Sequence, residues 1–268
     1  MDDVTIAQLA EGVAEEQFQN EVIAPLVLIE RLGITWSFGR YQSAFDGLIE
    51  YADGRFHIYL NQDRLGSLEA PRTRFTAAHE LGHYFIDEHR NTLVKTRQAH
   101  PSFIEVRSDL LVERQADHFA SNFLLPEKRF RKKAISRQPC CRTILALAET
   151  FNCSVQSTAI RYALTHPELV VAMFWGEESR HWCWSSEAAL ALTRNKAHKS
   201  TNKIPQGSVT HEVFHNPVTN VVVDETRGSL TSSWFPTISP GSSRDKICRE
   251  SAVQLGGFGV LTVLWLEP

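Results

Sequence analysis

The chain has 268 residues, of which 43% are hydrophobic and 22% charged, and it carries a formal net charge of -3. This balance is typical of globular proteins and excludes a disordered or low-complexity chain, because there is enough apolar surface to form a core. The small net charge also argues against a protein that binds nucleic acid with its whole surface.

At the start of the chain, Met1-Asp2-Asp3 is acidic, whereas a secretory signal begins with basic residues followed by an apolar run. No stretch of the sequence reaches the roughly 18 apolar residues of a membrane-spanning helix. The five cysteines are an odd number, which is not the pattern of a disulfide framework. The expected location is therefore the cytoplasm, with reduced thiols and no membrane partner.

The first part of the chain predicts two helices and a small sheet. Apolar residues recur at helical spacing from Thr5 to Leu32, and Pro25 should divide this segment into two short helices. Three runs of β-forming residues follow, and the last two flank Asp53-Gly54, a strong hairpin signal. They predict a small antiparallel sheet with strands Ile34–Phe38, Leu48–Tyr51 and Phe56–Leu60.

Helices dominate the middle of the chain. Pro71 opens a helical pattern that continues to Ile86. A further helix begins after Ser108-Asp109, which are candidates for its N-terminal cap, and should stop at Pro126. Shorter helices are expected at residues 127–136, 143–151 and 155–164.

After Pro167 the sequence changes to short β-branched and aromatic runs separated by Gly, Pro and Ser. The strands predicted there are Val170–Trp175, His181–Trp184, Val221–Val223 and Val260–Trp265, and Thr193 to Ser208 is expected to be a basic loop. We therefore predict an α+β protein of three parts, residues 1–136, 137–166 and 167–268.

One motif indicates chemistry. His79-Glu80-Leu81-Gly82-His83 lies in the predicted helix Pro71–Ile86, where residues four apart share a face. His79 and His83 can then bind one zinc ion, and Glu80 can act on a water molecule beside it. The alternative is a pair of ordinary surface or core histidines.

The same pattern occurs a second time, in His211-Glu212-Val213-Phe214-His215. The residues around it favour a strand, and little room for a helix remains between Gly207 and Pro217. Residues four apart in a strand are about 13 Å apart, so these two histidines could not share a metal ion. We predict no metal site at this second motif.

A catalytic zinc usually takes three protein ligands, so a third donor is required. Glu113 is the preferred candidate, because it lies one helical turn before Asp117, whose carboxylate can then accept a hydrogen bond from a ligand imidazole. A solvent-exposed acid is the alternative for each of the two. The other donors considered are Asp87, Glu88, Asp109 and Asp117 itself.

Three segments together resemble the ImmA/IrrE family of zinc metallo-endopeptidases, and they do so in the family's order. They are Phe75–His83, Val112–Ala120 and Phe123–Pro126. The resemblance is strong over Arg72–Pro126 and weak after Leu164. It implies a zincin-like metallopeptidase domain in which His79, His83 and Glu113 bind zinc and Glu80 is the catalytic glutamate.

The resemblance also implies a substrate. Members of this family cleave a helix-turn-helix repressor, which releases stress-response, mobile-element or phage-defence genes, and DNA damage is a frequent trigger. Many end in a sensor-like α+β domain, sometimes GAF-like, which residues 167–268 would form here. The chain departs from the family pattern at Asp117, where asparagine is common, and at Leu125, where methionine is common.

The reaction class follows from the residue types. Zinc acidifies a water molecule and polarises a carbonyl group, while Glu80 accepts the proton and passes it to the leaving amine, which is peptide hydrolysis. The strand Phe56–Leu60 is expected to be an edge on which an extended substrate segment pairs.

Two further features indicate nucleic acid as a partner. Residues 128–148 contain seven Lys or Arg and no acid, which predicts contact with nucleic acid or, as alternatives, a solvated charged face or a docking surface for the repressor. Residues 145–164 have the rhythm of a helix-turn-helix, or of a structural helix pair that connects the two larger parts. Five of the six tryptophans lie after residue 170, near the basic loop, which makes single-stranded DNA a candidate activator. The alternative is that these rings fill a core.

Two other functions remain open. One is a DNA-binding transcriptional regulator in which zinc is structural, and the other is a general cytosolic metallopeptidase. A regulatory endopeptidase should spare unfolded proteins that a general peptidase cleaves.

Overall fold

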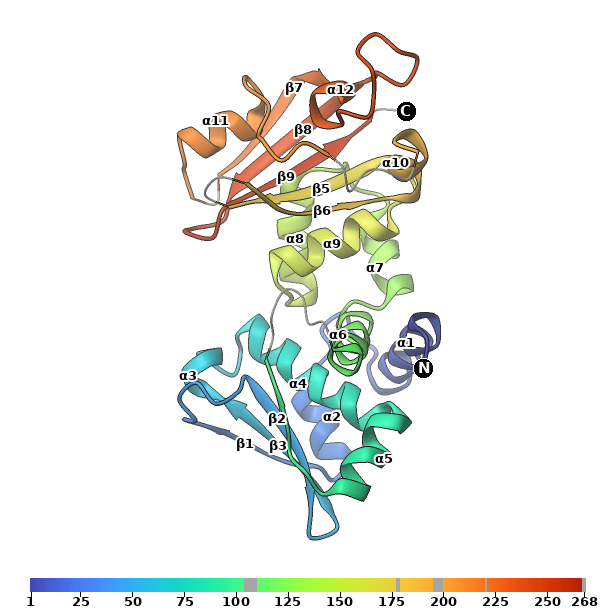
Figure 1. The fold of residues 1–268 in the computed structure, drawn as a ribbon, viewed down its shortest axis with the longest axis vertical. Coiled ribbons are helices and arrows are strands. Elements are labelled where there is room, and N and C mark those ends of the chain that lie inside the picture. The colour runs from blue at the N-terminus through green and yellow to red at the C-terminus, as the bar shows by residue number, and fades with distance from the viewer. Residues whose placement is uncertain (104–109, 177–178, 195–199, 220, 267–268) are drawn as a thin grey trace. The chain divides into compact units, whose positions relative to one another are not determined.

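The computed structural model describes residues 1–103, 110–176, 179–194, 200–219 and 221–266, with the backbone alone at 225–228. The chain divides into two compact units, one of Met1–Arg129 with Thr150–Ser154 and one of Phe130–Glu149 with Val155–Pro268. Each unit has its own sheet and helices, which makes this a mixed α+β protein (Figure 1). Among the described residues, no helix has the length and apolar character needed to cross a membrane. The three-part division at 136 and 166 stays a prediction.

The first unit combines helices with a four-stranded sheet. Its helices are α1 (Asp3–Gln17), α2 (Pro25–Arg31), α3 (Gln62–Leu65), α4 (Pro71–Phe85), α5 (Asp87–Thr96) and α6 (Leu111–Leu124). Its strands are β1 (Thr35–Gly39), β2 (Gly47–Ala52), β3 (Arg55–Asn61) and β4 (His100–Ser102). The expected helices and hairpin are present, and Pro25 and Pro71 each begin a helix, where a missing N–H costs nothing.

The sheet is mixed rather than antiparallel, so that part of the prediction was wrong. The strand order is β1-β3-β2-β4, and β1 runs parallel to β3 while the other pairs are antiparallel. The Asp53-Gly54 turn pairs β2 with β3 as expected, but β3 then enters between β2 and β1. The strand Phe56–Leu60 is therefore interior, and β4 and β1 are the edges.

Helix α4 packs against β2 and β3, whose residues Ile49, Ile58 and Leu60 are fully buried (Figure 1). Helix α6 packs against α4 at Gly82. A Cβ at Gly82 would lie 3.1 Å from Cα of Ala116, so a residue without a side chain lets the two helices approach closely. This contact brings the two parts of the predicted metal site together.

The start of α6 differs from expectation. Ser108-Asp109 lie outside the described residues, and the N-cap position is Leu110, which forms no side-chain cap. The helix ends at Leu124, before Pro126, as predicted.

The second unit contains an antiparallel sheet of order β6-β5-β9-β8-β7. Its strands are β5 (Val170–Trp175), β6 (Arg180–Ser185), β7 (Val222–Leu230), β8 (Ile247–Gln254) and β9 (Val260–Trp265), and its helices include α9 (Val155–Thr165), α10 (Glu187–Leu192), α11 (Val209–His215) and α12 (Thr231–Trp234). Two more helices, α7 (Glu127–Ala134) and α8 (Cys141–Phe151), belong mostly to the second unit, while a few residues at one end of each are assigned to the first. The predicted strands are present, whereas β8 was not predicted.

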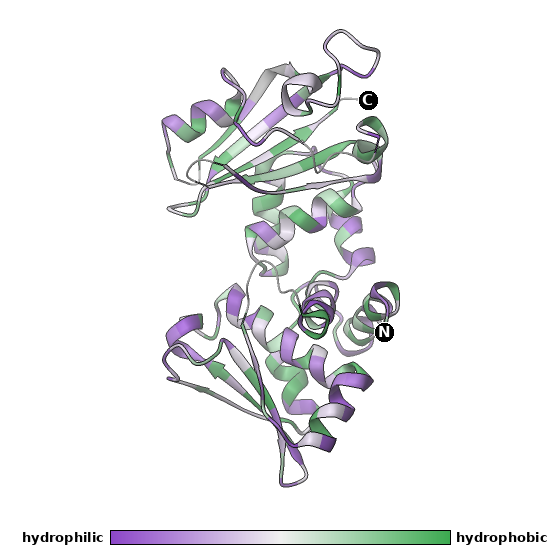
Figure 2. Cartoon of the chain, in the orientation of Figure 1, coloured by the Kyte–Doolittle hydropathy of each residue, from purple (hydrophilic) through white to green (hydrophobic). Residues whose placement is uncertain are grey.

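The core of the second unit includes buried residues of β5, β8, β9, α11 and α12. Strands β5 and β9 are hydrophobic along most of their length (Figure 2). Four of the five late tryptophans lie in the interior and only Trp184 is exposed, at 42%. The buried four are Trp175, Trp182, Trp234 and Trp265. These rings therefore fill the core, as the alternative interpretation of them proposed.

The second motif is helical, which corrects the strand prediction. His211 to His215 lie in α11, whose first N–H groups find acceptors. The Ser208 side chain accepts from the amide of His211, and the buried carboxylate of Glu250 accepts from the amide of Thr210 at 2.7 Å. Glu250 comes from β8, so the helix depends on a strand that is distant in sequence and was not predicted.

Candidate active site

Helix α4 directs the polar part of the first motif into the interior. His79 and His83 are each 1% exposed and Glu80 is fully buried. Because the spacing of four residues is one helical turn, both imidazoles lie on the same side, with ring centroids 4.8 Å apart. Three buried polar side chains on one helix must find polar partners or a cation.

Glu113 of α6 supplies the third group. Its carboxylate oxygens lie 3.3 Å from Nε2 of His79 and 3.5 Å from Nε2 of His83, and the two Nε2 atoms are 3.1 Å apart. Among the described residues, these three form the group of donors that could hold one metal ion. Donors about 2 Å from a tetrahedral zinc ion lie roughly 3.3 Å from one another, so the spacing fits.

The donor set has the right charge for a divalent cation. Burial opposes the charged form of Glu113, but hydrogen bonds from His100 and His79 outweigh it and hold the pKa of that carboxyl far below its usual range. Burial likewise opposes a charge on His79, yet Asp117 and Glu113 raise its pKa to about 10. The electrostatic field at this point therefore favours positive charge.

Glu80 is different, because neither of its carboxylate oxygens has a hydrogen-bond partner among the described residues. Burial raises the pKa of Glu80 to about 7, well above its usual 4.5. Gly47 of β2 lies against this carboxylate, and a side chain at Gly47 would collide with Oε1. The strand thus leaves room for the acid, whose raised pKa suits a group that takes and returns a proton near neutral pH.

Each imidazole is held through its second nitrogen. Nδ1 of His79 lies 2.8 Å from the Asp117 carboxylate, so the predicted contact of Asp117 with a ligand imidazole is present. Nδ1 of His83 lies 3.2 Å from Nδ1 of His89, whose other nitrogen contacts Gln115. Burial lowers the pKa of His83 and of His89, which favours the neutral ring. The Nε2 atoms of both rings face each other and the Glu113 carboxylate.

His100 and His89 also lie at the site, and neither was predicted from the sequence. His100 lies on the short edge strand β4, and its Nε2 is 2.5 Å from Oε1 of Glu113. A three-residue strand carries too little periodicity to be predicted, and His89 faces the site only because α5 turns back beside α4.

The other acids considered as ligands lie elsewhere. Asp87 is 65% exposed and pairs with Arg90, and Glu88 is 63% exposed and lies 3.5 Å from the N-terminal amine. Asp109 lies outside the described residues.

The second motif is assembled differently. The rings of His211 and His215 are 4.4 Å apart, as close as those of the first pair, but Glu212 and His215 are exposed. No third donor of the described residues joins them. The prediction of no metal site stands untested, although the strand geometry that supported it was wrong.

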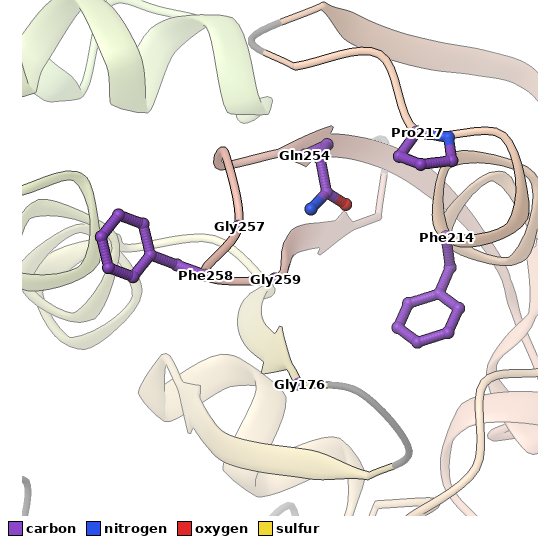
Figure 3. Close-up of a pocket in the computed structure, with 7 residues that line it drawn as sticks. All are labelled: Gly176, Phe214, Pro217, Gln254, Gly257, Phe258 and Gly259. Atoms are coloured by element: carbon purple, nitrogen blue, oxygen red, sulfur yellow. The ribbon is translucent and has the colours of Figure 1, made fainter.

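The second unit also has a small pocket, and Phe214 of the second motif is one of the residues that line it (Figure 3). The other lining residues are Gly176, Pro217, Gln254, Gly257, Phe258 and Gly259. None of these described lining residues has an ionisable side chain.

Comparison with known proteins adds three findings. Residues 41–162 match the family model of the IrrE N-terminal-like domain, peptidase family M78. A solved structure of a Mycobacterium tuberculosis transcriptional regulator is similar in fold, with a TM-score of 0.60, 13% identity, and coverage of 97% of this chain and 76% of that chain. No curated protein sequence matches. The family model spans all of the residues assembled around His79 and His83 except Met1.

Proposed function

The chain belongs to the M78 (ImmA/IrrE) peptidase family through residues 41–162, and from this premise we propose that it is a zinc-dependent regulatory endopeptidase. The observation that carries the proposal is the buried group of His79, His83 and Glu113 beside an unpartnered carboxylate, Glu80. These are a complete set of metal donors and a base, supplied by two helices.

His79, His83 and Glu113 would hold the metal ion. A bound ion would polarise the scissile carbonyl as a Lewis acid and would lower the pKa of a water molecule. Glu80 takes the proton of the attacking water at its carboxylate and donates it to the leaving amine. Asp117 and His89 keep the two imidazoles in orientation through their Nδ1 atoms, and the fixed positions reduce the reorganisation that the reaction needs.

The substrate we propose is a helix-turn-helix transcriptional repressor, whose cleavage would activate stress-response or phage-defence genes. Support comes from the family and from the regulator with a similar fold, although that likeness by itself concerns only the fold. We further propose that β4, the edge strand beside Glu113, pairs with an extended segment of the substrate. The sequence had suggested Phe56–Leu60 for this role, but that strand lies in the interior of the sheet. A flexible linker of the repressor fits such an edge better than a folded helix does.

The direct test is co-expression with the helix-turn-helix protein encoded by a neighbouring reading frame. We expect one discrete cut, abolished by a chelator and restored by zinc. Intact repressor in the presence of active, zinc-loaded protein would contradict the substrate assignment. Efficient cleavage of casein would instead favour the general metallopeptidase.

A DNA-binding regulator with a structural zinc is the rival from another class. A structural site needs only its ligands, and it leaves the buried Glu80 without a role. Stoichiometric zinc in a protein that binds duplex DNA and cleaves nothing would support that rival.

For the second unit, which we propose to be sensor-like, single-stranded DNA stays a candidate activator that signals DNA damage. Of the five tryptophans after residue 170, only Trp184 is exposed and could stack on a base, because the other four are buried. Lys196 and Lys199 of the basic loop lie outside the described residues. An oligonucleotide titration at low salt, read by tryptophan fluorescence and by cleavage rate, tests this directly.

A further inference from the structure

A line of contacts runs from His83 through two other side chains to the first residue of the chain. Nδ1 of His83 is 3.2 Å from Nδ1 of His89, and Nε2 of His89 is 2.9 Å from Oε1 of Gln115. Nε2 of Gln115 donates to the main-chain carbonyl of Met1 over 2.6 Å. The three side chains come from α4, α5 and α6 and are all buried, so water competes little for their hydrogen bonds.

The direction of this line is determined at its far end. A main-chain carbonyl can only accept, so Gln115 must turn its NH₂ group toward Met1 and its carbonyl oxygen toward His89. That oxygen also only accepts, so His89 must carry its hydrogen on Nε2. A neutral imidazole has one N–H, which leaves a lone pair on Nδ1 of His89. The remaining bond can form only if His83 carries its hydrogen on Nδ1.

We propose that Gln115 and His89 are positioning residues that determine the tautomer of His83. They place the hydrogen of His83 on Nδ1 and leave the lone pair of Nε2 toward His79 and Glu113. The assignment of this point as a metal site rests on the proposed function, but the tautomer itself follows from the hydrogen bonds alone.

The two ligand imidazoles are thus oriented by different chemistry. His79 donates to a carboxylate, Asp117, which brings a negative charge to the site. His83 donates to a neutral relay, which orients the ring without adding charge. With Glu113 and Asp117 already present, the total charge of the proposed ligands and their supports balances a divalent cation.

The test begins with the unsubstituted, metal-free protein labelled with ¹⁵N in its histidines. Imidazole ¹⁵N shifts distinguish a protonated nitrogen from one with a lone pair, and we expect Nδ1–H for His83 and Nε2–H for His89. Either ring in the opposite tautomer overturns the proposal. Because this measurement needs neither metal nor substrate, it is independent of whether the protein cleaves a repressor.

Two variants then test the consequence for metal binding. Gln115→Met and His89→Phe each remove the relay while nearly keeping the side-chain volume. We expect zinc affinity, measured by competition with a chelator, to fall roughly 10- to 100-fold in each, with mixed His83 tautomers. His118→Gln is the matched control, because His118 also joins α6 to the N-terminal segment, at Asp3, but lies outside the relay. Unchanged affinity and tautomer in a folded Gln115→Met or His89→Phe protein would refute the proposal.

Discussion

Each of the two units has the same pentapeptide pattern on a helix. Among the described residues, only the copy in α4 has a third donor facing its two imidazoles. In α4 and in α11 the paired imidazoles lie a turn apart with nearly equal ring separations, 4.8 Å and 4.4 Å. The helix spacing is therefore satisfied twice. The two copies differ in burial and in the side chains that neighbouring elements place around them, neither of which the spacing specifies.

Around α4, a second helix contributes three separate groups. Glu113 faces both imidazoles, Asp117 holds His79, and Gln115 holds His83 through His89. Around α11 the motif residues Glu212 and His215 are exposed, and the acid that contacts the helix, Glu250, caps its amide groups. The chemistry of such a motif thus depends on burial and on a partner helix rather than on the pattern.

The largest effect should come from the glutamate of the first motif, Glu80. Glu80→Gln removes the proposed base, whose carboxylate has no hydrogen-bond partner among the described residues, so cleavage should fall about 10²- to 10⁴-fold, while zinc binding to the proposed ligands is retained. Glu212→Gln, the matched change in the second motif, should leave cleavage unaltered. Cleavage rates and zinc content of the two purified variants measure this. Normal cleavage by Glu80→Gln would show that the base is another residue.

The same substitution should stabilise the metal-free first unit in a pH-dependent way. Burial raises the pKa of Glu80 from 4.5 to about 7, so the folded state keeps a proton that the unfolded chain releases. The free energy of unfolding therefore falls as pH rises from about 4.5 through 7. The total cost is roughly 3 kcal/mol, at about 1.4 kcal/mol for each pKa unit. Glu80→Gln avoids it.

Urea unfolding of the metal-free proteins at pH 4.5 and pH 8 measures this gain. The advantage of Glu80→Gln should be large at the higher pH and nearly absent at the lower one. An equal gain at both values would mean that ionisation of Glu80 is not its cause, and Glu212→Gln should show no gain at either.

A smaller effect is expected at Asp117. Asp117→Ala removes the acceptor of His79 and should weaken zinc binding roughly 10- to 100-fold, because an orienting carboxylate also makes the imidazole more basic. Asp117→Asn keeps an acceptor and should lose less. Competition with a chelator measures the zinc affinity of the unsubstituted protein and of the two variants. Equal affinities would show that Asp117 does not support the metal site.

The smallest effect should come from the second histidine pair. Replacing both His211 and His215 with alanine should leave the amount of tightly bound zinc and the cleavage rate unchanged. A loss of one equivalent of tightly bound zinc on this replacement, measured by elemental analysis, would show that spacing on an exposed helix is sufficient.

Much of the first unit was predictable because its signals are local. The helices α1, α2 and α4 follow from apolar spacing, α2 and α4 also from the prolines at their starts, and the β2–β3 hairpin follows from Asp53-Gly54. The position of Glu113 on α6, one turn before Asp117, was also expected, and the structure brings Glu113 to His79 and His83. Its role there as a ligand stays a prediction.

The failures all involve contacts between distant segments. The parallel pairing of β1 with β3 depends on where a later strand is inserted, and the helical state of α11 depends on Glu250, forty residues away from Thr210. His100 and His89 contact site residues from β4 and α5, and the sequence of neither element indicates that it lies beside α4 and α6.

The sequence by itself determined which residues have side chains able to bind a metal ion or transfer a proton, because side-chain type and helical spacing are properties of a short segment. Only the tertiary structure decided which copy of the motif is buried, which acid faces it and how each imidazole is oriented. Those outcomes depend on the packing of α4 against α6 at Gly82 and on hydrogen bonds between segments far apart in the chain, where desolvation makes each polar contact matter most.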